Sequence, residues 1–78
     1  MKNRIRLDTM KDVNEFVTIA TACKGKVLLQ SSDGFCVSGK SMLGALASME
    51  FNDLWVVSDD DIYSKIEKFI IIEDISVN

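Results

Sequence analysis

The stretch that decides the fold runs from residue 34 to residue 44 and reads Gly-Phe-Cys-Val-Ser-Gly-Lys-Ser-Met-Leu-Gly. Its first half contains Phe35-Cys36-Val37, a short apolar run that is typical of a strand. Ser41 has the short hydroxyl favoured at a helix N-cap, and residues 42–49 are rich in good helix formers. The stretch therefore predicts a strand that leads directly into a short helix.

A second apolar run lies just before this stretch. Val27-Leu28-Leu29 is joined to Phe35-Cys36-Val37 through Ser31-Ser32-Asp33-Gly34. An Asp-Gly pair between two such runs is a strong hairpin signal. We expect the two runs to pair as antiparallel strands.

The amino-terminal part predicts a strand and an amphipathic helix. Residues 4–7 alternate polar and apolar side chains with the period of two that a strand requires. Asp12 and Glu15 are spaced to cap a helix and to complement its dipole, and Gly25 is suited to end it. The apolar stripe of this helix follows at the spacing i, i+3, i+4, i+7 and consists of Val13, Phe16, Val17 and Ala20.

The carboxyl-terminal part predicts another strand and a third helix. Residues 54–57, Leu-Trp-Val-Val, read as a buried strand. Asp59 to Asp61 place negative charge where the next helix should start, and its inner stripe would be Ile62, Ile66, Phe69 and Ile70. Residues 71–78 are too apolar for a solvated tail. We expect this extension to continue the helix, to add an edge strand or to pack against a second copy of the chain.

Composition indicates a single folded domain over residues 1–78. The hydrophobic fraction of 47% lies well above that of disordered chains. Cys23 and Cys36 are too few for a disulfide framework, and the chain has no histidine to complete a zinc set with them. We expect both to be small buried side chains in a reducing compartment. No long apolar segment follows Met1, so we expect a cytoplasmic protein that does not use a membrane.

The residue types alone argue against several classes of function. The net charge of −3, with scattered Lys and Arg, argues against nucleic acid as a partner. The absence of histidine excludes imidazole chemistry, and no Ser or Cys has a candidate base nearby. We therefore expect no enzymatic activity, no catalytic residue, no metal site and no cofactor.

The expected order of elements is β-α-β-β-α-β-α, and three amphipathic helices need a common sheet surface to cover. With that order in place, the pattern Gly34-x-x-Val37-x-x-Lys40-Ser41-Met42-Leu43-Gly44 resembles the hairpin and helix of HPr, the phosphocarrier protein of the bacterial sugar phosphotransferase system. The resemblance extends over about residues 3–70. It implies an α+β fold: an HPr-like open-faced β-sandwich, with a four-stranded antiparallel sheet and three helices on one face.

The resemblance fails at the site that carries phosphate in HPr. The family uses a histidine in a His-Ala-Arg-Pro-like run between the first strand and the first helix. Here that stretch is Asp8-Thr9-Met10-Lys11-Asp12, which is shorter, lacks all three of His, Arg and Pro, and places two carboxylates where a phosphoryl group would be repelled. No phosphocarrier residue is carried over. The chain would be a divergent, non-catalytic member.

Ser41 matches the second phosphorylation site of the family, a serine that a dedicated kinase modifies in many Gram-positive relatives and that governs binding to a transcriptional regulator. The alternative is that Ser41 only caps its helix. Met42 and Leu43 match exposed docking residues of HPr, although Leu43 could equally be an inner-face core residue. The resemblance thus implies a regulatory adaptor that binds a protein partner, such as a regulator, a kinase or a transport component. Its docking residues would be Lys40, Ser41, Met42, Leu43 and Leu46.

Two further hypotheses remain open. Residues 34–41 match the P-loop pattern G-x-x-x-x-G-K-[ST], so a small nucleotide-binding module could use Gly39, Lys40 and Ser41. A phosphate cradle needs a tight loop of open N–H groups, however, whereas Phe-Cys-Val favours a strand. The other hypothesis is a self-associating domain, a homodimer through residues 70–77.

Overall fold

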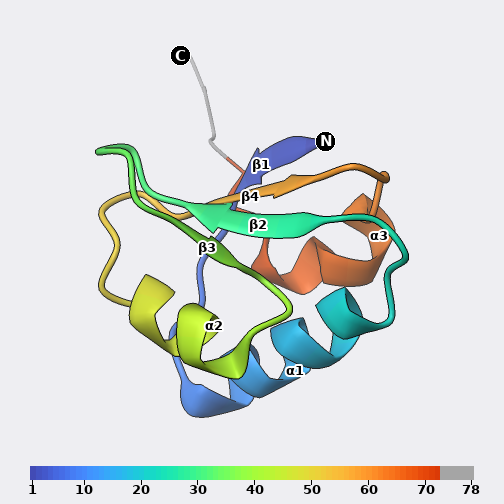
Figure 1. Ribbon diagram of the computed structural model, residues 1–78, viewed down its shortest axis with the longest axis horizontal. Coiled ribbons are helices and arrows are strands. Elements are labelled where there is room, and N and C mark those ends of the chain that lie inside the picture. Colours follow the sequence, from blue (N-terminus) through green and yellow to red (C-terminus); the bar gives the residue numbers. More distant parts are fainter. Residues whose placement is uncertain (73–78) are drawn as a thin grey trace, which may run out of the picture.

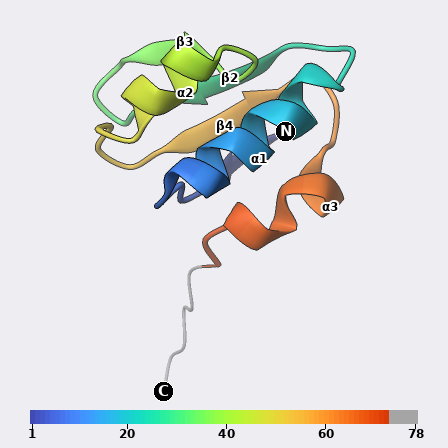
Figure 2. The ribbon, with the colours of Figure 1, turned by 90° about the horizontal axis from the view of Figure 1, so that it is seen from below.

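The strands and helices follow one another along the chain in the order that the sequence predicts. The computed structural model describes residues 1–72. The elements are β1 (Lys2–Arg4), α1 (Met10–Thr21), β2 (Val27–Gln30), β3 (Cys36–Ser38), α2 (Met42–Ser48), β4 (Trp55–Ser58), α3 (Tyr63–Ile66) and a closing 3-10 turn, η1 (Glu67–Phe69). In Figure 1 the sheet lies above the three helices, and in Figure 2 the same helices lie in front of it. The helices therefore cover one face of the sheet and leave the other open.

The four strands form one antiparallel sheet in the order β1-β4-β2-β3. Strand β4 lies between β1 and β2, so Val56 is opposite Asn3 on one side and Leu29 on the other. Strands β2 and β3 form the predicted hairpin, with Leu29 opposite Val37. The expected α+β class, an open-faced β-sandwich with a four-stranded antiparallel sheet, is confirmed.

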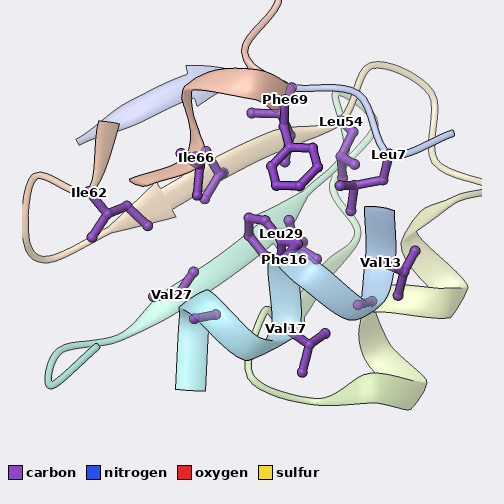
Figure 3. Close-up of a cluster of buried hydrophobic side chains, with 14 residues drawn as sticks. Leu7, Val13, Phe16, Val17, Val27, Leu29, Leu54, Ile62, Ile66 and Phe69 are labelled. Atoms are coloured by element: carbon purple, nitrogen blue, oxygen red, sulfur yellow. The ribbon is translucent and has the colours of Figure 1, made fainter. Parts of the chain in front are cut away.

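The hydrophobic core lies between the sheet and the helices (Figure 3). All four residues of the predicted stripe on α1 are buried. The ring of Phe16 on this stripe meets the ring of Phe69 edge to face, with 6.1 Å between their centroids. Leu29 and Val56 of the two central strands are fully buried beneath them. Each such large apolar side chain stabilises the fold by about 1.5–3 kcal/mol, so this layer fixes the position of α1 on the sheet.

The predicted ends of α1 were wrong in their details. The helix begins at Met10, and its N-cap is Thr9, whose hydroxyl accepts the Asp12 N–H at 3.1 Å. The carboxylate of Asp12 instead accepts the N–H of Asp8 at 3.0 Å. Asp12 therefore closes the turn before the helix.

Gly25 does not end the helix by a positive φ. The helix stops at Thr21 with Ala22 as its C-cap, and Gly34 in the hairpin turn is the glycine with positive φ among the described residues. A Cβ on Gly25 would lie 2.9 Å from the Cβ of Asp59. A glycine is needed there because the chain after β4 passes so close to it.

The third helix is shorter than predicted, but it does begin beside negative charge, since the carboxylate of Asp61 accepts the N–H of Tyr63, the first helical residue, at 3.0 Å. Helix α3 is one turn that continues as η1, and within this region Ile62, Ile66 and Phe69 are buried as expected. Asp59 lies outside the helix, and its carboxylate accepts the N–H of Lys26 at 2.9 Å. The acidic run is thus the turn between β4 and α3, and Asp59 bonds it to the loop after α1.

Ile70, predicted as part of the helical stripe, is extended and forms an antiparallel bridge with Ile5. Arg6 donates its N–H to the carbonyl of Phe69, and Ile71 donates to the carbonyl of Arg4. Residues 70–71 therefore pair like the expected edge strand and do not continue the helix. Residues 73–78, with most of the expected dimer segment 70–77, lie outside the described residues.

Two residues expected in the core lie on the open face of the sheet. Gln30 is opposite both Cys36 and Trp55, so all three point to the same side. Cys36 is exposed, and Trp55 is half-buried with the Lys2 ammonium 5.2 Å from its ring centroid. Cys23 is half-buried. The expectation that both cysteines are buried was wrong. For Cys36 the reason is that an apolar run does not show which of its alternating side chains face the helices.

Candidate functional site

Ser41 caps α2, as the sequence predicts. Its backbone is extended, and its hydroxyl accepts the N–H of Gly44 at 3.1 Å. Gly44 packs closely on the hairpin, since a Cβ there would lie 3.0 Å from the carbonyl oxygen of Ser38. The cap and this contact together set the direction in which α2 leaves β3.

Lys40 ties the start of α2 to the end of α1. Its ammonium donates to the carbonyl of Cys23 at 2.7 Å, and the side chain is half-buried. Carbonyls just beyond a helix C-terminus have no partner within the helix, and a cation there also complements the dipole. In the free chain Lys40 is thus occupied by an internal contact.

Met42 and Leu43 project into solvent from the first turn of α2. Met42 is 38% exposed and Leu43 is 80% exposed, so Leu43 is not a core residue. Leu46 is half-buried and packs against the core, and Ser41 is half-buried beside them. Of the five expected docking residues, the structure therefore presents Met42 and Leu43 most openly.

The P-loop pattern does not form a phosphate cradle. Residues 36–38 form β3, and the next three N–H groups bond within the chain. Gly39 donates to Val27, Lys40 to the Ser38 hydroxyl and Ser41 to the Ser38 carbonyl. The backbone N–H groups that a cradle would turn toward a nucleotide phosphate are therefore already bonded within the chain, and the Lys40 ammonium lies on Cys23.

Gly39 is explained by packing alone. It is buried, and a Cβ there would lie 2.9 Å from Cγ1 of Val27 and 3.1 Å from Cε2 of Phe16. Any side chain would push α1 away from the sheet. The glycine of the pattern therefore serves the core, and the nucleotide-binding hypothesis has no geometric support.

The segment between β1 and α1 borders a cavity of about 370 Å³. The cavity is lined by Arg6, Asp8, Asp12 and Lys68 together with residues 69–71, so it carries two positive and two negative side chains. Arg6 lies 3.8 Å from Asp8, and Lys68 pairs with Glu15 at 2.8 Å. Within residues 1–72 no three His, Cys, Asp or Glu side chains gather as a metal site would require.

Phe35 was not predicted as a functional residue. This residue is 64% exposed, and its ring stacks on that of Phe51, with centroids 6.0 Å apart and planes at 25°. Phe35 shares the alternation of Val37 and so faces the helix side, but it lies at the hairpin tip. Its place directly after the Asp33-Gly34 turn is the signal that could have shown that it extends beyond the helices.

A scan against protein-family models, a search of curated proteins and a search of solved structures each give no match for this chain. Within residues 1–72 no helix has both the length and the apolar character needed to cross a membrane.

Proposed function

We propose that this chain is a non-catalytic, HPr-like regulatory adaptor of the bacterial cytoplasm that binds a protein partner through the start of α2. The observation that carries this proposal is the 80% exposure of Leu43 next to Met42. Adjacent exposed apolar side chains are typical of an interaction site, and methionine adapts to partners of different shape. The partner is a regulator, a kinase or a transport component.

The start of α1 supports a role in recognition over one in phosphoryl transfer. In addition to lacking histidine, the chain fills this region with its own hydrogen bonds, from Asp12 N–H to Thr9 and from Asp8 N–H to Asp12. The carboxylates of Asp8 and Asp12 offset the positive charge of Arg6 and Lys68 at the same cavity, so no net attraction for a phosphoryl group is left there. The adaptor's docking face is therefore proposed at the start of α2 and not at the start of α1.

Phosphorylation of Ser41 is proposed as the switch of this face. A phosphate on Ser41 keeps an acceptor for the Gly44 N–H and adds about −1.5 to −2 units of charge. Beside it, that charge attracts the Lys40 ammonium away from the Cys23 carbonyl, to which it is bonded at 2.7 Å. The modification would thus change both the charge and the anchoring of the docking face.

Incubation with an HPr serine kinase and Mg-ATP tests the switch by mass spectrometry. We expect one phosphoryl group on Ser41, none on the Ser41→Ala variant and the normal single addition on a Ser32→Ala control. A chain that gains no mass at Ser41 would leave this residue with its capping role only.

Capture of a partner from host lysate tests the docking face. We expect Met42→Asp and Leu43→Asp each to lose a partner that the unchanged chain retains. Thr18→Asp, on the exposed side of α1, is the matched control and should retain it. If all three variants hold the same partner, the start of α2 is not the docking face.

Self-association is measured separately, because the segment assigned to it falls mostly outside the described residues. Sedimentation of the full chain is compared with that of a chain ending at Ile72. A dimer that disappears on truncation would favour the self-associating domain over the adaptor.

A further inference from the structure

A second apolar surface lies at the opposite end of α2 from Ser41. It consists of an apolar floor and a polar rim around a cavity of about 200 Å³. The floor is formed by Phe35, Phe51 and Ala47, and the rim by Asp33, Glu50 and Asn52. In Figure 1 the β2–β3 turn and the loop after α2 lie at the same end of the molecule. We call this surface the hairpin groove.

Hydrogen bonds within the β2–β3 turn fix the backbone that carries Phe35. Phe35 and Ser31 exchange hydrogen bonds, since Ser31 N–H donates to the Phe35 carbonyl and Phe35 N–H donates to the Ser31 hydroxyl, both at 2.9 Å. The same hydroxyl donates to the carboxylate of Asp33. Gly34 supplies the positive φ, 102°, that closes the turn. An aromatic ring on such a fixed turn loses little freedom when a partner covers it.

The stacking of Phe35 on Phe51 determines which part of the Phe35 ring a partner can contact. One face of its ring is turned to Phe51 at 25°, and the side chain is still 64% exposed. The rest of the ring is therefore presented to solvent beside a small apolar hollow. Aromatic faces of this kind attract cations as well as aliphatic groups.

The charged side chains on the rim of the hairpin groove are negative. Asp33 and Glu50 are both exposed carboxylates, and within residues 1–72 no Lys or Arg lines the cavity. A guanidinium suits this arrangement best, because it stacks flat on an aromatic ring while its N–H groups pair with carboxylates. A second copy of the chain suits it poorly, since a symmetric contact would bring four carboxylates together.

We propose that the hairpin groove binds an arginine-bearing segment of a partner protein. The guanidinium stacks on Phe35 and pairs with Asp33 and Glu50, and an adjacent aliphatic side chain enters the hollow against Ala47 and Phe51. The groove is distinct from the face around Ser41, Met42 and Leu43, so it stands whether or not that face is a docking site.

The probe is a library of random linear peptides displayed on phage and selected on the full chain, which is immobilised by a carboxyl-terminal tag. We expect enrichment of peptides with arginine next to Leu, Ile or Met. The affinity of a recovered peptide is then measured by fluorescence anisotropy against the full chain and three variants: Phe35→Ser, Glu50→Gln and Leu43→Ser. All three residues are exposed and lie outside the hydrophobic core of the described residues.

Phe35→Ser should weaken the peptide at least about tenfold, and Glu50→Gln about threefold with a reduced salt dependence. Leu43→Ser should leave the affinity unchanged. A selection that enriches no sequence, or one without arginine, overturns the proposal. So does an affinity that survives Phe35→Ser. A peptide lost on Leu43→Ser alone also overturns it, while supporting the face at the start of α2.

Discussion

The side chain of Lys40, which directly precedes the N-cap of α2, reaches the carbonyl of Cys23, 2.7 Å from its ammonium. This bond joins the two helices at the point where α1 has ended and α2 has not yet begun. It also gives Lys40 a structural role, whereas the docking hypothesis expects Lys40 to contact a protein partner and the nucleotide-binding hypothesis expects it to contact a phosphate. The stability of the chain should therefore depend on Lys40.

Lys40→Met is expected to lower the free energy of unfolding by about 1–2 kcal/mol, because it leaves the half-buried Cys23 carbonyl without its charged donor. Urea denaturation followed by circular dichroism measures the change. Lys11→Met, at an exposed position of α1, is the control and should stay within about 0.5 kcal/mol of the unchanged chain. Equal stability of the two variants would show that the bond to Cys23 contributes nothing.

Thr9→Ala should cost about 1 kcal/mol through loss of the N-cap of α1. Thr18→Ala removes a hydroxyl that donates to the carbonyl of Asn14 within the same helix, on its exposed side. Such a bond to a helical carbonyl adds little, so this variant should be nearly neutral. Thermal unfolding of the two proteins distinguishes them, and a larger loss in Thr18→Ala would contradict the assigned cap.

Two leucines should differ sharply in their effect on stability. Leu29 is fully buried in the central strand β2, and Leu29→Ala is expected to cost about 2–5 kcal/mol. Leu43 is 80% exposed, and Leu43→Ala should cost less than about 0.5 kcal/mol. Denaturant midpoints of both variants provide the test. A strongly destabilised Leu43→Ala would mean that this residue belongs to the core and not to a docking face.

The two thiols should react at different rates with a coloured disulfide reagent. Cys36 is exposed on the open face of the sheet, whereas Cys23 is half-buried and donates to the carbonyl of Ile19 at 3.3 Å. We expect a fast phase and a slow phase, with the fast phase absent from Cys36→Ser. Loss of the slow phase in that variant instead would reverse the assignment.

The amphipathic pattern accounts for what the sequence could predict. The stripe Val13, Phe16, Val17 and Ala20 and the Asp33-Gly34 turn depend on short spacings that only one local structure satisfies. It was harder to predict which strand side chains are exposed, as Cys36 and Trp55 show. An apolar run has two faces, and which face the helices cover depends on residues far away in the sequence.

The candidate site was predictable in part for the same reason. The cap of Ser41 is a local feature, and its position was found from the sequence. The bond from Lys40 to Cys23 and the stack of Phe35 on Phe51 join residues that only the folded sheet and helices bring together. No spacing rule relates these pairs.

The pairing of Ile5 with Ile70, and the place of β4 between β1 and β2, have a consequence for synthesis of the chain. On the ribosome, the hairpin and the first two helices can form early, but β1 has no neighbour until Trp55–Ser58 has emerged. The nascent chain must then hold β1 unpaired until β4 has been synthesised. We infer that the sheet closes only at that stage and that β1 is open to chaperones before it.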